Sequence, residues 1–220
     1  MPNIIAIIPA YNEEKHIEEI INRTKKYVTL VIAVDDGSSD STYKKSRSAD
    51  IILRHIVNLG KGAALKTGFL TAIKNKADII VTLDADGQNN PEDIPKFIEA
   101  LERHNADIIV GARKFNKNMP IVFRLGNWGL RKIFQVLFKL KVNDSQSGFR
   151  AVRANIYPKI KWQSTDYSVE AEMLANAGRN NLRCIEVPIA TKYLNKYKGT
   201  TIVDGINIFL QMILWRLRQL

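Results

Sequence analysis

The stretch from Ile79 to Gln88 limits the fold of this chain more than any other part of the sequence. Its first five residues are apolar or β-branched, which is typical of a strand that is buried on both faces of a parallel sheet. Asp84 and Asp86 follow at once, so we expect two carboxylates at the carboxyl end of a central strand. This is the edge at which open α/β sheets bind ligands.

The spacing of these acids indicates a metal ion. Side chains two residues apart on an extended chain point the same way, so Asp84 and Asp86 could face one cation, and the amide oxygen of Gln88 continues the series. Such oxygen ligands favour Mg²⁺ or Mn²⁺ beside a diphosphate over zinc. The alternative is a turn whose first Asp caps the backbone, which is common where Asp precedes Gly.

Strands and helices alternate regularly up to about residue 113 and predict a right-handed parallel α/β sheet. A turn at 144–149 then leads into a strand that completes a mixed sheet, and 167–176 is expected to be helical. The other expected strands are 3–8, which ends at Pro9, 30–34, 51–53, 79–83, 108–110, and 183–187, which stops at Pro188.

A second pair of acids stands at the end of the second strand. Asp35 and Asp36 are costly at a strand end unless they are solvated or bound, and no structural role for them follows from the sequence. Ser39 or Asp40 is expected to cap the next helix. Asn12 fits the N-cap of the first helix as well as it fits a ligand contact.

The segment Gly60-Lys61-Gly62 precedes a predicted helix. Its backbone N–H groups and the Lys61 ammonium could lie near phosphate. The spacing is not that of a Walker loop, and close packing of the helix at the two glycines is the interpretation that we favour. Tyr11, in the turn after the first strand, could stack on a base.

The net charge of +11 lies entirely in the second half of the chain. Residues 1–113 hold 15 Lys and Arg against 16 Asp and Glu, whereas residues 114–220 hold 18 against 6. This asymmetry indicates that the second half meets something anionic, such as nucleic acid or acidic lipid.

Two apolar segments of the second half are basic as well. Residues 120–142 carry five Lys and Arg and no acid, which favours a helix that lies in a bilayer interface over ordinary core packing. Residues 203–220 form an apolar helix with Arg216 and Arg218 near its end, as interfacial anchors. No apolar run reaches the roughly 18 residues that a membrane span needs.

Cys184 is the only cysteine, which excludes a disulfide framework. With no basic leader before an apolar stretch, we expect a cytosolic protein. We predict one domain in three parts, 1–113, 114–202 and 203–220, of which the last is a membrane or partner helix.

Six short motifs recur in the order found in a known enzyme family. Together they resemble the family 2 inverting glycosyltransferases of GT-A fold, and within them the polyprenyl-phosphate group typified by dolichyl-phosphate mannose synthase. The motifs are Pro9-Ala10-Tyr11-Asn12-Glu13, Val34-Asp35-Asp36-Gly37-Ser38, Asn58-Leu59-Gly60-Lys61-Gly62, Asp84-Ala85-Asp86-Gly87-Gln88, Ser147-Gly148-Phe149 and Glu186-Val187-Pro188-Ile189.

The resemblance implies a role for particular residues. Pro9, Tyr11 and Glu13 would border the nucleoside, Asp36 would bind the base, and Lys61 would lie on the donor. Asp84, Asp86 and Gln88 would hold Mg²⁺ or Mn²⁺ and the diphosphate, with Asp86 also catalytic. Arg113 and Arg124 would hold phosphate and would also be catalytic. Residues 1–113 would be the donor-binding half and residues 114–202 the acceptor-binding half. Lys196 stands where relatives have an arginine before Gly-x-Ser, and a lysine lacks its bidentate fork.

The resemblance also implies an activity. It would move a hexose, mannose or glucose, from a GDP- or UDP-linked donor to a polyprenyl or dolichyl phosphate at the cytosolic membrane face. The enzyme would bind the membrane surface peripherally, with a small membrane subunit or a second copy as a further partner and no nucleic acid. A saccharide or other hydroxyl acceptor is the alternative, and it would need Asp144 or Glu170 as a base. A basic nucleic-acid-binding module is a remote third.

Overall fold

The structure, a computed structural model, describes residues 2–113, 129, 132 and 135–190. The helix predicted at 203–220 lies outside these residues, as does most of the interfacial helix predicted at 120–142. Arg124 and Lys196 lie outside them too. The division of the chain at 113 and 202 stays a prediction.

The described residues form one sheet of seven strands in the order β3-β2-β1-β4-β6-β5-β7. β6 runs antiparallel to both of its neighbours, and all other neighbouring pairs are parallel. The predicted mixed, mostly parallel sheet is therefore confirmed. The strands are β1 (Ile4–Ala10), β2 (Leu30–Asp35), β3 (Ile51–Arg54), β4 (Ile79–Thr82), β5 (Ile108–Arg113), β6 (Arg150–Arg153) and β7 (Cys184–Ile189).

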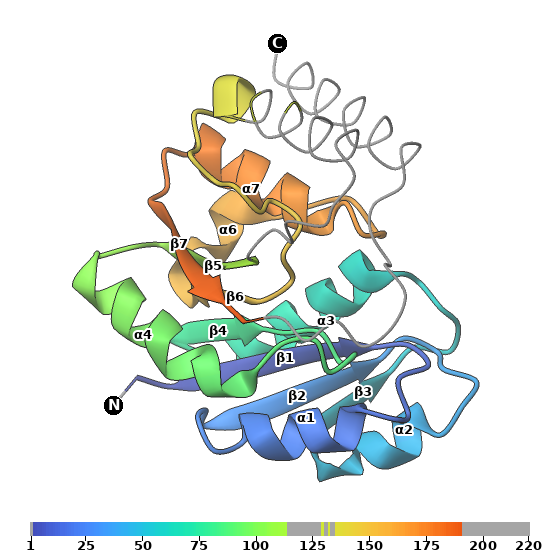
Figure 1. The fold of residues 1–220 in the computed structure, drawn as a ribbon. Helices are drawn as coiled ribbons and strands as arrows, with labels where there is room; N and C mark the ends of the chain where they lie inside the picture. The colour runs from blue at the N-terminus through green and yellow to red at the C-terminus, as the bar shows by residue number, and fades with distance from the viewer. Residues whose placement is uncertain (1, 114–128, 130–131, 133–134, 191–220) are drawn as a thin grey trace.

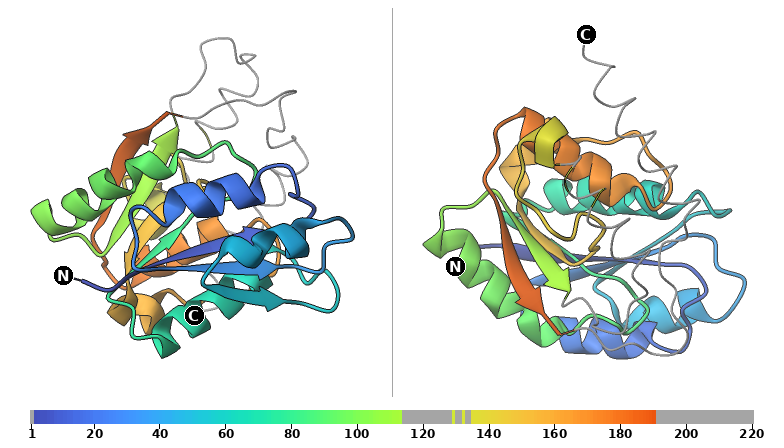
Figure 2. Two further views of the ribbon diagram at one scale, coloured as in Figure 1. Left: turned by 90° about the horizontal axis from the view of Figure 1, so that it is seen from below. Right: turned by 45° about the horizontal axis from the view of Figure 1, so that its top comes forward.

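Helices cover both faces of the sheet (Figures 1 and 2). α1, α2 and α4 lie on one face, and α3, α6 and α7 lie on the other. Their bounds are α1 (Ile17–Thr24), α2 (Thr42–Lys45), α3 (Lys61–Lys74), α4 (Ile94–Arg103), α6 (Tyr157–Ile160) and α7 (Val169–Arg179), with 3-10 turns η1 (Ser46–Ser48), η2 (Pro91–Asp93) and η3 (Ala154–Ile156).

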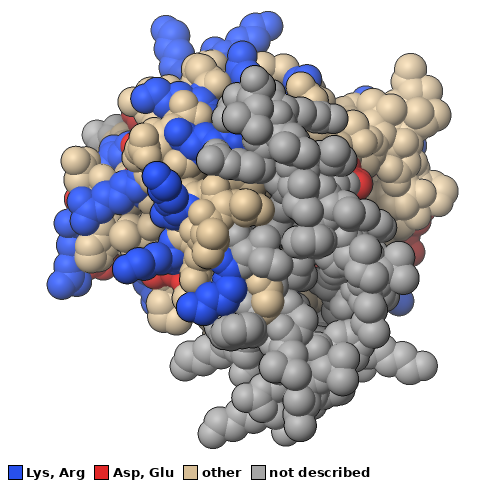
Figure 3. All heavy atoms as spheres, turned by 90° about the horizontal axis from the view of Figure 1, so that it is seen from above, with Lys and Arg blue, Asp and Glu red and all other residues tan. Residues whose placement is uncertain are grey.

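The described surface on the α7 side is basic. Seen from above in Figure 3, Lys and Arg gather beside the grey atoms and outnumber Asp and Glu. Four exposed lysines lie around the C-terminal end of α7. Asn176 and Asn180 at this end donate hydrogen bonds to the backbone carbonyls of Lys161 and Lys159, and Gly178 lies against Phe138 and Leu140 on either side of Lys139. We call these the α7 lysines: Lys139, Lys141, Lys159 and Lys161.

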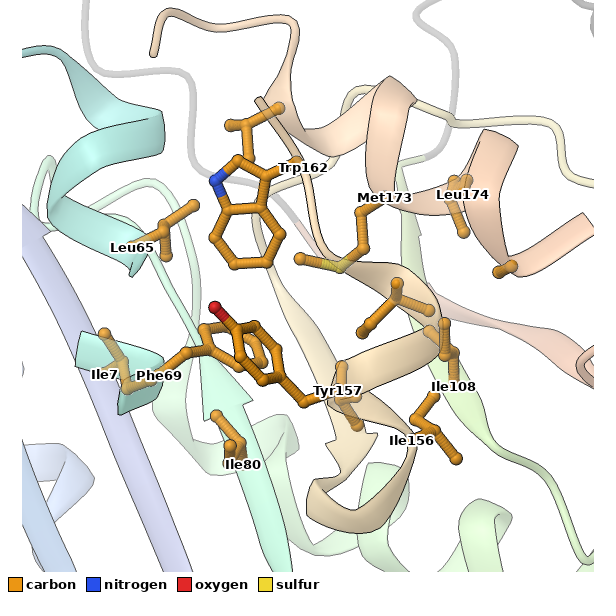
Figure 4. Packing of buried hydrophobic residues seen from close by; sticks show 14 of the residues in the cluster. Ile7, Leu65, Phe69, Ile80, Ile108, Ile156, Tyr157, Trp162, Met173 and Leu174 are labelled. Atoms are coloured by element: carbon orange, nitrogen blue, oxygen red, sulfur yellow. The ribbon is translucent and has the colours of Figure 1, made fainter. Parts of the chain in front are cut away.

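The central strands are buried on both faces. In β1, Ile5 and Ile7 pack toward α3 and α7, while Ala6 and Ile8 pack toward α1 and α4. On the α3 side Phe69 stands at the centre of an aromatic group (Figure 4). Its ring centroid lies 5.4 Å from that of Tyr157 and 5.2 Å from that of Trp162.

Two prolines that were expected to end strands lie within them. β1 continues through Pro9 to Ala10, because its pairing with β4 has already ended at Ile7 and Thr82, so the missing N–H of Pro9 breaks no ladder bond there. β7 continues through Pro188. β7 lies at the edge of the described sheet, where a proline is tolerated.

The strand that was expected to complete the mixed sheet is β6, and it inserts between β4 and β5, a position that the sequence did not predict. The helix expected to run to Val142 ends at Phe138, and Lys139 has φ of 55°. Phe138, Leu140 and Val142 pack in the core beside α7, whereas Val136, Lys139 and Lys141 of the same stretch are exposed.

Within the described part of the chain, no helix has both the length and the hydropathy that a membrane span requires.

Candidate active site

An ion-pair chain joins three elements at the carboxyl edge of the sheet. Lys61 is the first residue of α3, Asp84 follows β4, and Glu170 lies in the first turn of α7. The Lys61 ammonium lies 2.5 Å from Asp84 Oδ1 and 2.6 Å from Glu170 Oε1. Burial alone would lower the pKa of Lys61, but the two carboxylates raise it above its ordinary value, so the side chain stays charged.

A glycine makes room for this ion pair. Gly148 lies against it so closely that a Cβ would fall 2.6 Å from Asp84 Oδ2 and 2.8 Å from Lys61 Nζ. The Gly148 carbonyl accepts a hydrogen bond of 2.7 Å from the Thr82 hydroxyl at the end of β4. The motif Ser147-Gly148-Phe149 therefore positions the acidic end of β4.

Asp86 closes a turn. Its Oδ1 accepts the backbone N–H of Gln88 at 2.9 Å, so the capping acid is the second Asp of the motif and not the first. Asp84, Asp86 and Gln88 are each partly exposed. In the described residues no three acidic, His or Cys side chains are grouped to hold a metal by themselves.

These oxygen atoms fit a cation whose coordination is completed by a bound ligand. Mg²⁺ commonly takes one or two carboxylates from the protein and its other oxygens from substrate phosphates and water. Asp84 and Asp86 supply two carboxylates at a partly exposed edge. Gln88 adds an amide oxygen beside them.

Asp36 is buried and binds neighbouring loop groups, which gives it the structural role that the sequence did not reveal. It accepts the backbone N–H groups of Leu59 at 3.0 Å and Gly60 at 2.8 Å. His55 Nδ1 lies 2.6 Å from the same carboxylate. Asp36 thus holds the start of the loop that leads to Lys61.

Asp35 has a structural role as well. It accepts the N–H of Ser38 at 3.2 Å and pairs with Arg54 at 3.0 Å. Ser38 is a local partner, three residues along the chain, but Arg54 comes from the end of β3. The partners of Asp36 all come from the β3–α3 connection, so the fold and not the local pattern supplies them.

The β1–α1 loop is tied to the β2–α2 loop. Asn12 has φ of 56°, and its side chain accepts the N–H of Ser39 at 3.0 Å. Because α1 begins only at Ile17, Asn12 is not its N-cap, and that expectation is wrong. Glu13 donates its N–H to Thr42 Oγ1, while Tyr11 is 46% exposed beside the buried Pro9.

Arg113 lies at the end of β5 in a bidentate pair. Its Nε is 2.7 Å from Asp144 Oδ2 and its NH2 is 2.9 Å from Oδ1. Glu186 holds Asp144 in turn by accepting its backbone N–H at 2.9 Å. The Glu186 motif therefore fixes the orientation of Arg113 from a neighbouring strand.

The start of α3 packs against another loop, as the glycines predicted. Gly60 has φ of 93°, and a Cβ on Gly62 would lie 2.1 Å from the Ser164 carbonyl oxygen. Glu172 fixes this loop by accepting the N–H groups of Gln163 at 3.0 Å and Ser164 at 2.8 Å. Glu172 and His55 were not singled out from the sequence, since an acid in a helix and a lone histidine carry no local signal.

The comparisons with known proteins decide the family. Residues 5–161 match the sequence model of glycosyl transferase family 2. The chain belongs to this family. It is 36% identical over 241 residues to the UDP-N-acetylglucosamine–dolichyl-phosphate N-acetylglucosaminyltransferase of Methanococcus voltae, covering 97% of this chain and 96% of that one. It is 29% identical to the undecaprenyl-phosphate mannosyltransferase of Micrococcus luteus, covering 92% and 88%.

A solved structure gives the fold of this family 2 glycosyltransferase. Glucosyl-3-phosphoglycerate synthase from Mycobacterium tuberculosis, in complex with Mn²⁺, uridine diphosphate and phosphoglyceric acid, superposes with a TM-score of 0.76 at 19% identity. The match covers 98% of this chain and 78% of that one. The protein therefore has the GT-A fold, and the predicted fold class and family are confirmed.

Proposed function

We propose that this glycosyltransferase moves a sugar from a nucleotide-diphosphate sugar to a polyprenyl phosphate, with inversion at the anomeric carbon. The observation that carries the proposal is the partly exposed pair Asp84 and Asp86 at the carboxyl edge of β4, beside the Lys61 ammonium. The names of the relatives support a lipid-phosphate acceptor.

The donor would lie along the carboxyl edge of β1, β2 and β4. Pro9, Tyr11 and Glu13 would border the nucleoside on one side, and Asp36 would do so from the end of β2. The exposed Tyr11 ring offers a stacking surface for a base.

Asp84, Asp86 and Gln88 would hold Mg²⁺ or Mn²⁺ at the diphosphate. Such a cation neutralises the charge that develops on the departing nucleoside diphosphate, without a proton. Its use is supported by the structural neighbour, which was solved in complex with Mn²⁺ or Mg²⁺ and uridine diphosphate. Lys61 would place a further positive charge beside the same group.

The acceptor phosphate would need orientation more than activation. A phosphate monoester is largely dianionic near neutral pH, since its second pKa is about 6, and so it requires no strong base. Arg113 would hold it, with Arg124 and Lys196 as further proposed contacts. Asp144 already pairs with Arg113, and Glu170 already pairs with Lys61. These ion pairs argue against either acid as the base for a hydroxyl acceptor.

The enzyme would work peripherally at the cytosolic face of a membrane, where polyprenyl phosphates are embedded. The α7 lysines support this placement, because a cluster of exposed lysines is attracted to anionic lipid. A small membrane subunit or a second copy of the chain remains a proposed partner, and no nucleic acid is proposed.

The test is a transfer assay with labelled donors, Mn²⁺ or Mg²⁺, and a short polyprenyl phosphate. UDP-N-acetylglucosamine comes first because the Methanococcus voltae relative is named for it, followed by GDP-mannose and UDP-glucose. We expect the label in a chloroform-extractable lipid. Label that appears only on soluble saccharides would refute the proposed acceptor.

A further inference from the structure

Asp84 is already paired with a positive charge in this structure. The Lys61 ammonium lies 2.5 Å from its Oδ1, and the side chains of Lys61 and Asp84 are 15% and 29% exposed. The lysine is therefore nearly buried, while the carboxylate is more accessible to solvent. A divalent cation that binds Asp84 must approach this ammonium and be repelled by it.

Glu170 gives the ammonium a second partner. Its Oε1 lies 2.6 Å from Lys61 Nζ, and its side chain is only 4% exposed. If a metal ion takes Asp84, Lys61 keeps an ion pair with Glu170. A buried ammonium left without a partner would be far more costly than the exchange.

The charges of the cluster also limit what the free site attracts. Lys61 offsets one of the two carboxylates, so the site of the free protein carries less negative charge than its acids alone would give. A nucleoside diphosphate restores that negative charge and supplies the oxygens that a metal ion still lacks.

We propose that Lys61 and Glu170 are positioning residues that make metal binding depend on the nucleotide diphosphate. Lys61 occupies Asp84 in the free enzyme, and Glu170 holds the ammonium aside when metal and donor arrive together. The inference rests on the proposed metal site at Asp84 and Asp86, and it adds an order of binding. An ion pair that serves only the fold would not produce such an order.

The test is a titration with Mn²⁺ followed by the electron paramagnetic resonance signal of the free ion, without nucleotide and with UDP or GDP. For the wild type we expect UDP or GDP to tighten Mn²⁺ binding by about tenfold or more. For Lys61→Met we expect Mn²⁺ without nucleotide to bind about tenfold tighter than to the wild type, with a smaller further gain from nucleotide than in the wild type, since the diphosphate oxygens still bind the metal.

Two more variants separate charge from folding. Lys61→Met/Glu170→Gln removes both charges of the buried pair, so it leaves no unpaired acid at Glu170, and it should also bind Mn²⁺ without nucleotide more tightly than the wild type. Glu170→Gln alone should weaken Mn²⁺ binding in the presence of nucleotide, because the ammonium then has only Asp84. Lys66→Met, an exposed lysine of the same helix, is the matched control and should behave as wild type.

The outcomes are distinct. If the wild type binds Mn²⁺ with UDP or GDP but neither Lys61 variant gains binding without nucleotide, the inference is overturned and the metal site stands. If the wild type binds no Mn²⁺ with either nucleotide, or Asp86→Ala binds it as well as the wild type, the proposed metal site itself fails.

Discussion

Gly148 and Asp84 come from segments 64 residues apart, yet a Cβ on Gly148 would lie 2.6 Å from Asp84 Oδ2 and 2.8 Å from its Oδ1. The backbone after β4 and the turn before β6 are thus fitted to each other. Any residue larger than glycine at position 148 would therefore crowd Asp84, which is proposed to bind the metal ion.

Gly148→Ala is therefore expected to cost activity more than stability. The added methyl meets only the far ends of two side chains, Asp84 and Lys61, which can swing aside toward the open edge. A displacement of about 1 Å at a catalytic group costs roughly 100-fold in rate, so we expect a loss of that size in kcat/KM. Gly178→Ala is the contrast, since its Cβ would lie 2.2 Å from the backbone oxygen of Phe138 and should lower the melting temperature instead. Equal activity of Gly148→Ala and wild type would contradict the fit.

Asp144→Asn tests whether Asp144 is a base. Removing a general base typically costs 10²–10⁴-fold in rate, whereas loosening a bidentate arginine costs about tenfold. Because Asp144 binds Arg113 through both oxygens, we expect the smaller loss, with the pH profile of kcat/KM unchanged in shape. Glu186 accepts the backbone N–H of Asp144, so Glu186→Gln should loosen Asp144 and lower kcat/KM as well. Complete loss of turnover at every pH would favour a hydroxyl acceptor.

Metal removal should abolish transfer reversibly. We expect EDTA to stop turnover and Mg²⁺ or Mn²⁺ to restore it. Asp86→Ala should lose the cation-dependent part of donor binding in calorimetry while its melting temperature stays close to wild type, because a partly exposed carboxylate contributes little to the core. Unchanged donor affinity of this variant in the presence of Mn²⁺ would count against the assignment.

The sequence predicts the features that depend on local hydrophobic periodicity. The buried run before Asp84 and the polar residues after β1 and β2 are visible as pattern, and their placement at one sheet edge follows from parallel topology. The insertion of β6 beside β4 is not visible as a pattern. The pairing of these two strands, which are about 70 residues apart, depends on tertiary packing and not on any local repeat.

The candidate site divides in the same way. The sequence placed Lys61 near a donor, but its partners Asp84 and Glu170 lie on other elements, and only the folded chain brings them together. Likewise, Asp35 and Asp36 lacked a role until Arg54 and His55 were placed beside them. Buried ion pairs of this kind leave no spacing signal.

Phe69→Ala should destabilise the protein strongly. Phe69 is fully buried and stacks on Tyr157 at 5.4 Å, so its removal leaves a cavity in the core on the α3 side. Such truncations cost about 3–5 kcal/mol. Leu70→Ala, at a neighbouring residue that is 52% exposed, should change the free energy of unfolding by less than about 1 kcal/mol. Urea unfolding measures both, and equal losses would contradict the packing in Figure 4.

Cys184 should be unreactive in the folded protein. Burial against the core raises the pKa of its thiol to about 12, so almost no thiolate is present near neutral pH. Because Cys184 is the only cysteine, a thiol reagent such as DTNB reports on it alone. We expect labelling of the native protein at pH 8 to be at least about 100-fold slower than in guanidinium chloride, since the thiolate is the reactive form.

The same shift makes stability depend on pH in the alkaline range. The pKa of the thiol is about 9 when the chain is unfolded, so above this value the unfolded state loses a proton that the folded state keeps. This term therefore lowers the free energy of unfolding as pH rises above about 9, and Cys184→Ser should remove that part of the decline. For the DTNB experiment, rapid, stoichiometric labelling of the native protein would contradict the expected slow labelling and show that β7 opens readily at the edge of the sheet.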